Sequence, residues 1–177
     1  AYNRPIYYDE QTAKENNVNY LLAVGGGSVL DATKLISASV LFEGDAWDLV
    51  TYPKLLGEVL PYASVMTLPA TGSEMNRCAV ISNIETKEKF SFYSSYPQFS
   101  ILDPKTTFSL PKYQIACGIA DTFVHVMEQY LTKSNHSIVM DRWAEGILIS
   151  LIELAPKLLK DGEKDYESMA NFMLAAT

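Results

Sequence analysis

The stretch YLLAVGGGSVLD, residues 20–31, decides the fold of this chain of 177 residues. A short apolar run, residues 20–24, is closed by three consecutive glycines, and apolar residues then recur at roughly helical spacing over residues 28–42. This order predicts a β-strand, a tight turn and an α-helix. The first part of the chain is therefore expected to be α/β.

A second predicted strand, residues 63–68, runs into a loop of small and hydroxyl-bearing residues, PATGS at 69–73. Two strands of one parallel sheet would end at the same edge, where open α/β sheets bind ligands. We therefore expect this loop and the glycine turn to come close together. Further short strands are predicted by the segments 80–82, 89–93 and 99–102, with a polar turn between the first two.

The pattern changes after Leu110-Pro111, where the apolar period becomes helical. We predict an α/β domain over residues 1–109 and the start of an all-α domain over residues 110–177. The expected inner face of the first helix consists of Ala120, Phe123, Val124, Met127 and Leu131. That of the second consists of Trp143, Ile147, Leu148, Leu151 and Leu158, and Pro156 should kink or split this helix.

Composition narrows the class of protein. Hydrophobic residues make up 48% of the chain and charged residues 20%, as in globular proteins, and the net charge of −7 disfavours nucleic acid and anionic lipid as partners. Apolar runs are too short to cross a membrane.

Cys78 and Cys117 form no paired motif, so we expect a reducing, cytoplasmic setting. The chain lacks an initial Met and stops within an apolar, helix-forming stretch, so we expect truncation at both ends.

The glycine turn is a candidate phosphate site. Gly25, Gly26 and Gly27 lack Cβ atoms, so a phosphate can approach the backbone, and Ser28 begins the helix whose N–H groups would hold it. The sequence is neither GxGxxG nor a Walker loop, and a sharp turn without a ligand is the alternative.

The loop TLPATGSE, residues 67–74, offers the hydroxyl groups of Thr67, Thr71 and Ser73 to ribose or phosphate oxygens. The alternative is an ordinary Pro/Gly turn. Lys89 would add a positive charge at the same edge, although a single exposed lysine is more often solvated surface.

Asp121 and His125, in GIADTFVHVMEQY, are four residues apart and so lie on one face of a helix. A carboxylate and an imidazole at this spacing suit iron(II) or zinc. On spacing alone an i,i+4 surface pair is the more common situation, and a catalytic metal usually needs at least three protein ligands. The remaining histidine, His136, is expected to be a solvent-exposed turn residue.

The motifs GGGSVLD, TLPATGSE, ILDP and GIADTFVHVMEQYLT, in this order, resemble the iron-containing alcohol dehydrogenase family. The resemblance covers essentially the whole chain and is closest to the branch of butanol dehydrogenases and NADPH-dependent aldehyde reductases. It implies a Rossmann-like α/β part followed by an all-α part, the dehydroquinate synthase-like fold, here truncated at both ends. The family's first strands and two further metal-binding histidines are absent.

The resemblance also implies roles. Gly25, Gly26, Gly27 and Ser28 would contact the pyrophosphate of NADP or NAD, Thr67 and Thr71 the nicotinamide side, and Lys89 would lie beside the cofactor. Asp121 and His125 would be the first two ligands of iron(II) or zinc. The expected activity is hydride transfer between NAD(P)H and a short-chain aldehyde or alcohol in a homodimer, without a catalytic protein nucleophile. A glycerol-dehydrogenase-like or dehydroquinate-synthase-like enzyme and a non-catalytic dinucleotide-binding module are the alternatives.

Overall fold

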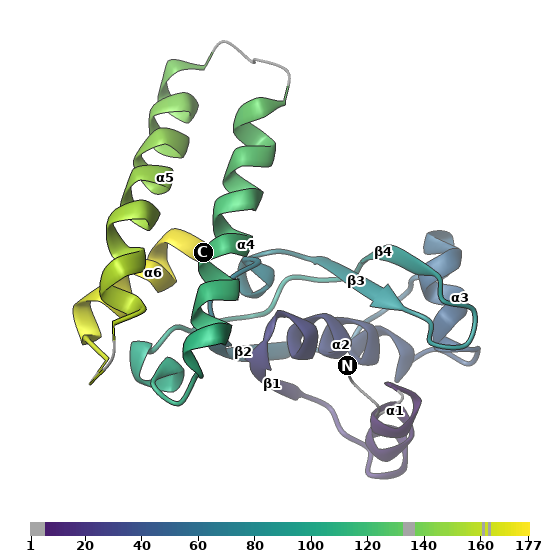
Figure 1. Ribbon diagram of the computed structural model, residues 1–177. Coiled ribbons are helices and arrows are strands. Elements are labelled where there is room, and N and C mark those ends of the chain that lie inside the picture. The colour runs from purple at the N-terminus through teal and green to yellow at the C-terminus, as the bar shows by residue number, and fades with distance from the viewer. Residues whose placement is uncertain (1–5, 133–136, 161, 163) are drawn as a thin grey trace. The chain divides into compact units, whose positions relative to one another are not determined.

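The computed structural model describes residues 6–132, 137–160, 162 and 164–177 (Figure 1). The chain divides into two compact units. The first consists of Ala1–Met66 and Ser73–Ile101, and the second of Thr67–Gly72 and Leu102–Thr177. The domain limits expected from the sequence, residues 1–109 and 110–177, stay a prediction. Each unit is described by itself below.

Up to residue 101 the chain forms short helices and strands, and the strand, turn and helix predicted over residues 20–42 are found. The elements are α1 Ile6–Glu15, β1 Leu21–Gly26, α2 Gly27–Ser39, α3 Ala46–Thr51, η1 Pro53–Leu55, β2 Tyr62–Leu68, η2 Ser73–Met75, β3 Cys78–Ser82, β4 Lys89–Tyr93 and β5 Ser100–Ile101. Three strands form a sheet in the order β1-β2-β5, in which β2 and β5 are parallel. A separate antiparallel hairpin joins β3 to β4, with Ser82 paired to Lys89 beside the turn.

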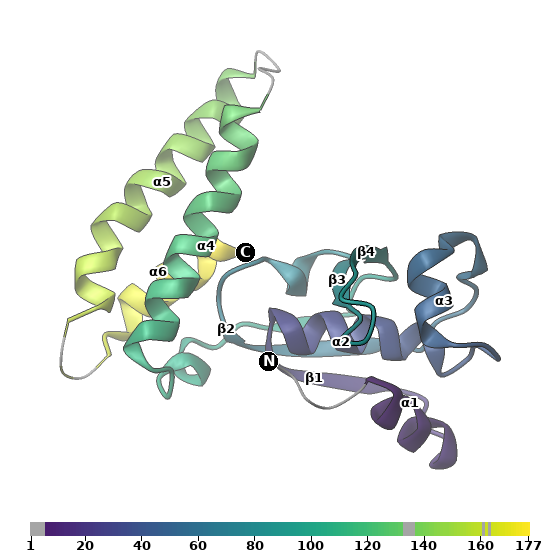
Figure 2. The same ribbon diagram turned by 45° about the vertical axis from the view of Figure 1, so that its right-hand side comes forward.

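Helix α2 packs between these two layers. Figure 2 shows β1 and β2 on one side of the helix and the β3–β4 hairpin on the other. Because both sides of α2 are covered, polar residues such as Lys34 and Ser37 are fully buried beside the apolar ones. Leu35 and Ala38 belong to the apolar core, together with Leu49, Val50, Ala79, Ile81 and Phe92.

The second unit is helical after a single 3₁₀ turn. Its elements are η3 Pro104–Thr107, α4 Lys112–Leu131, α5 Ile138–Leu158 and α6 Tyr166–Ala176. Helices α4 and α5 run side by side in both views, and α6 packs against them (Figures 1 and 2). The buried core consists of Ile115, Ile119, Leu151, Leu154, Leu158, Met169, Phe172 and Ala176.

The predicted inner faces of the two long helices need correction. In α4 the buried residues are Ile115, Gly118, Ile119 and Thr122, whereas Val124 and Leu131 of the predicted face are exposed. In α5 Leu148, Leu151 and Leu158 are buried as predicted, but Trp143 is 64% exposed. Both helices carry apolar residues on more than one side. The spacing of apolar residues alone therefore predicted the wrong buried face for α4.

Pro156 does not split α5. The helix runs through this residue and ends two residues later, at Leu158. A proline so near the C-terminal end ends the helix rather than dividing it. Among the residues that the structure describes, no helix has both the length and the apolar character needed to cross a membrane.

Candidate cofactor and metal site

The start of α2 suits an anion. Gly26 is the N-cap residue, no side chain caps the helix, and no acidic residue lies in its first turn. The backbone N–H groups of the first helical turn have no partner within a helix, and they carry the positive end of the helix dipole. The predicted phosphate site is therefore a helix start with no side-chain cap and no carboxylate in its own first turn.

Gly25 and Gly26 are constrained by different features: the space around the Cβ position at Gly25 and the backbone conformation at Gly26. A Cβ on Gly25 would lie 2.5 Å from Cγ2 of Val29, so this buried position has no room for a side chain. Gly26 has φ −87° and ψ −172°, an extended conformation open to any residue. Packing against α2 therefore requires a glycine at position 25, whereas at position 26 the backbone conformation does not.

The loop Thr67–Gly72, which follows β2, packs against α4 within the second unit. A Cβ on Gly118 would lie 2.5 Å from the carbonyl oxygen of Pro69, and the hydroxyl group of Thr122 donates a hydrogen bond to the carbonyl oxygen of Ala70 at 3.1 Å. Gly72 has φ +63°, where glycine is favoured. The loop is therefore held on one stripe of α4, and Thr71 in it is exposed.

Asp121 and His125 lie beside that stripe. Asp121 follows Gly118 by three residues and His125 follows Thr122 by three, so each is a surface neighbour of a residue under the loop. His125 Nε2 and Asp121 Oδ2 are 3.7 Å apart, and the side chains are 49% and 46% exposed. This separation is that of an i,i+4 ion pair and is longer than a hydrogen bond. A carboxylate oxygen and an imidazole nitrogen therefore lie together on one partly exposed face of α4.

The pair alone is an incomplete metal site. No group of three or more His, Cys, Asp or Glu side chains able to hold a metal occurs within residues 6–132, 137–160, 162 and 164–177. His136 lies outside the described residues. Cys78 and Cys117 are free, and Cys117 is exposed on α4.

The structure gives the positions of the other predicted cofactor-binding residues but does not show them in contact with one another. Lys89 is exposed at the first position of β4, and the ring of the adjacent Phe90 contacts Trp47 of α3. The glycine turn belongs to the first unit and Thr67 and Thr71 to the second. The expected approach of the two loops therefore stays a prediction.

Sequence reasoning missed a buried polar network behind the glycine turn. Asp31 and Lys34 of α2 both bind the segment that begins at Ser73, directly after the Thr67–Gly72 loop. Asp31 stands in the quoted GGGSVLD motif, but nothing in a single sequence shows that a lysine three residues later is fully buried.

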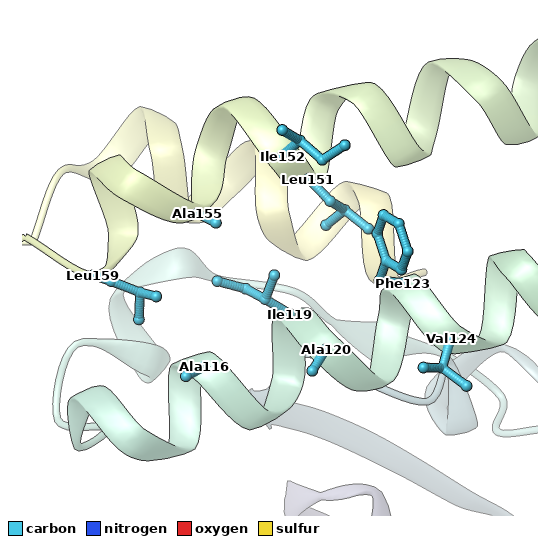
Figure 3. Close-up of a pocket in the computed structure, with 9 residues that line it drawn as sticks. All are labelled: Ala116, Ile119, Ala120, Phe123, Val124, Leu151, Ile152, Ala155 and Leu159. Atoms are coloured by element: carbon cyan, nitrogen blue, oxygen red, sulfur yellow. The ribbon is translucent and has the colours of Figure 1, made fainter.

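An apolar hollow of about 300 Å³ lies between α4 and α5 (Figure 3). Its lining includes Ala120, Phe123 and Val124 from α4 and Leu151 and Ile152 from α5, with no charged residue. At about 100° per residue, the α4 residues that line it face away from Asp121 and His125. This hollow is therefore not the metal site.

Comparison with known proteins places the chain in a family. Residues 10–104 match the model of the iron-containing alcohol dehydrogenases. The chain is 47% identical over 166 residues to the probable NADH-dependent butanol dehydrogenase 1 of Bacillus subtilis. It is 48% identical over 169 residues to the NADPH-dependent aldehyde reductase YqhD of Escherichia coli. Each alignment covers 93% of this chain and 43% of the relative.

Solved structures agree with the sequence comparisons. The crystal structure of YqhD from Escherichia coli superposes with a TM-score of 0.91 at 45% identity, over 97% of this chain and 45% of that one. The NADH-dependent butanol dehydrogenase A of Thermotoga maritima gives a TM-score of 0.90 at 38% identity, over 97% and 43%.

The chain belongs to the iron-containing alcohol dehydrogenase family. The predicted resemblance and the predicted fold, a Rossmann-like α/β part followed by helices, are confirmed. The chain spans less than half the length of these relatives.

Proposed function

We propose that this protein transfers a hydride between NAD(P)H and a short-chain aldehyde or alcohol, with a divalent metal bound by Asp121 and His125. The observation that carries the proposal is the packing of the Thr67–Gly72 loop on α4. The loop proposed to contact the nicotinamide side and the two proposed metal ligands lie on adjacent stripes of one helix, within one compact unit.

Each group of residues has a separate part in this proposal. The backbone of Gly25, Gly26, Gly27 and Ser28 at the start of α2 binds the pyrophosphate. Thr67 and Thr71 hold the nicotinamide end, and Lys89 neutralises a phosphate or ribose-phosphate charge beside it. Asp121 supplies an oxygen donor and His125 a nitrogen donor to the ion.

The chemistry needs no protein nucleophile. The cofactor supplies the hydride, and the metal supplies Lewis acidity toward the oxygen of the substrate. The residues of this chain bind and orient these groups. Their placement matters because a misplacement of about 1 Å can lower a rate on the order of 10²-fold.

The names of the family and of the relatives support the proposed choice of cofactor and metal. Iron is favoured over zinc by the family description. The names of the relatives include both NADH- and NADPH-dependent enzymes, so we propose that the protein uses one of these two dinucleotides. A homodimer in a cytoplasmic setting stays the expectation for the complete enzyme.

The proposal is tested in the complete enzyme, extended through the two metal-binding histidines that this chain lacks, by aldehyde-dependent oxidation of NADH and NADPH, with butanal as substrate and with added iron(II) or zinc. Substituting either ligand, Asp121→Asn or His125→Ala, should lower kcat/KM by at least roughly 10²-fold, since the metal would no longer be held in place. The control Glu153→Gln removes an exposed carboxylate from α5 and should keep the activity. Turnover that survives both ligand substitutions would contradict the metal assignment.

A further inference from the structure

Lys34, in the middle of α2, is a fully buried charged residue with no part in the proposed chemistry. Its Nζ atom lies within hydrogen-bond distance of four acceptors, which share its three N–H groups. They are the carbonyl oxygen of Ser73 at 2.8 Å, the Ser73 hydroxyl oxygen at 2.7 Å, Asn76 Oδ1 at 3.0 Å and the carbonyl oxygen of Cys78 at 2.6 Å. All four acceptors belong to one short stretch, residues 73–78. One ammonium group therefore binds the whole segment that follows the Thr67–Gly72 loop.

Asp31 completes the attachment one helical turn earlier. The hydroxyl group of Ser73 donates to Asp31 Oδ1 at 2.7 Å, and the backbone N–H of Val80 donates to Asp31 Oδ2 at 3.0 Å. Ser73 thus accepts a hydrogen bond from Lys34 and donates one to Asp31 through the same hydroxyl group. The geometry fixes both the position and the orientation of this serine on α2.

The sheet holds the same turn from a second direction. Ser100 of β5 donates to the carbonyl oxygen of Glu74 at 2.7 Å, and Ser64 of β2 donates to the hydroxyl oxygen of Ser100, also at 2.7 Å. Ser64 and Ser100 are paired in the parallel register of β2 and β5. The single turn of η2 is therefore attached to α2 on one side and to the sheet on the other.

Stability alone does not account for this arrangement. Burial lowers the pKa of Lys34, because removing an ammonium group from water is unfavourable. Apolar residues of similar volume often replace a complete buried ion pair without loss of stability. What an apolar side chain cannot reproduce is the set of directed hydrogen bonds that determines the conformation of residues 73–78.

We propose that Lys34 is a positioning residue of the cofactor site, which holds Ser73 on α2 and thereby fixes the end of the loop that carries Thr71. The inference rests on the proposed function, in which Thr71 contacts the nicotinamide side. Lys34 touches neither cofactor nor substrate in this account. It acts through Ser73, two residues after Thr71, on the nicotinamide half of the dinucleotide and not on the pyrophosphate at the start of α2.

The test compares the binding of NADH and NADPH with that of ADP-ribose, which has the pyrophosphate but no nicotinamide, by isothermal titration calorimetry. Lys34→Met should weaken the binding of the dinucleotide about tenfold, equivalent to about 1.4 kcal/mol, and that of ADP-ribose by less than about threefold. A purely structural defect would reduce the competent fraction of protein and weaken both ligands equally.

Two further variants keep the test decisive. Ser73→Ala leaves Lys34 bonded to the backbone and should give the same selective loss, smaller in size, even if Lys34→Met does not fold. The matched control is Lys164→Met in the second unit, where the ammonium group likewise donates to backbone carbonyl oxygens, those of Thr107, Phe108 and Leu110. This control should leave the ratio of the two affinities unchanged.

The outcomes separate the two proposals. A selective loss for the dinucleotide in Ser73→Ala, together with one in Lys34→Met where that variant folds, supports the positioning role. An equal loss for both ligands, or no loss in Ser73→Ala, overturns it. If the unsubstituted protein bound neither the dinucleotides nor ADP-ribose, the proposed function itself would be wrong, and this inference with it.

Discussion

Gly118 is the residue that lets the Thr67–Gly72 loop lie directly on α4. A Cβ at this position would meet the carbonyl oxygen of Pro69 at 2.5 Å and the ring of Phe172 at 3.2 Å. The loop backbone is also held by a hydrogen bond from the hydroxyl group of Thr122, one turn after Gly118 on α4, to the carbonyl oxygen of Ala70. The loop therefore cannot move away from Gly118 independently. Proximity of the loop to the Asp121–His125 pair thus depends on a single missing methyl group.

Substituting this glycine should separate loop and helix. Although alanine is the better helix former, Gly118→Ala should lower the free energy of unfolding by about 1–3 kcal/mol, because the added methyl group forces the loop away. The matched control is Gly146→Ala in α5, where a Cβ meets nothing within 4 Å. The control should raise the free energy of unfolding by up to about 1 kcal/mol. Urea unfolding of both variants measures the difference, and equal stabilisation by both would contradict the contact.

The residues of the site were predictable from the sequence to different degrees. Asp121 and His125 could be proposed as metal ligands because a spacing of four places two donors on one face of any helix. Gly118 and Thr122 could not, since their role depends on a loop some 50 residues earlier in the chain. Lys34 was missed because lysine is rarely fully buried, and no pattern in the neighbouring sequence indicates that this lysine is buried.

At the scale of elements, the strands and the start of α2 were the most predictable features. Strand β4 was predicted at its observed bounds, and β1, α2 and β2 to within three residues. Glycine and proline residues mark these boundaries, and a backbone requirement of that kind is visible in sequence. The inner face of α4 was not predictable in the same way, because Val124 and Leu131 are as apolar as the buried Ile115 and Ile119.

The corrected face of α5 leads to a test within this helix. Leu151 is 1% exposed in the core, so Leu151→Ala should lower the free energy of unfolding by about 2–5 kcal/mol. Trp143, which the sequence predicted to be buried, is 64% exposed. Trp143→Ala should therefore change the free energy of unfolding by less than about 1 kcal/mol. Thermal or urea unfolding compares the two. A larger effect at Trp143 than at Leu151 would mean that the observed packing of α4 and α5 is wrong.

At the scale of the whole molecule, the proposed anion site on α2 belongs to one unit and the proposed metal donors on α4 to the other. The net charge of −7 gives no general attraction for phosphate, so the proposed binding relies on the local backbone of the glycine turn. The fold class could be predicted because the order of motifs is specific. The relative placement of the two loops could not, since it depends on contacts outside each motif.

The most direct test of the account is the affinity of the protein for NADH and NADPH with and without a side chain at Gly26. The extended backbone of this residue is a conformation that valine also adopts, and the circular dichroism spectrum and unfolding midpoint are the controls that Gly26→Val is folded. The valine side chain should nevertheless keep phosphate from the N–H groups of α2 and weaken binding at least about tenfold by calorimetry. Binding of either dinucleotide that is as tight in folded Gly26→Val as in the unsubstituted protein would contradict the assignment of the glycine turn as the cofactor site.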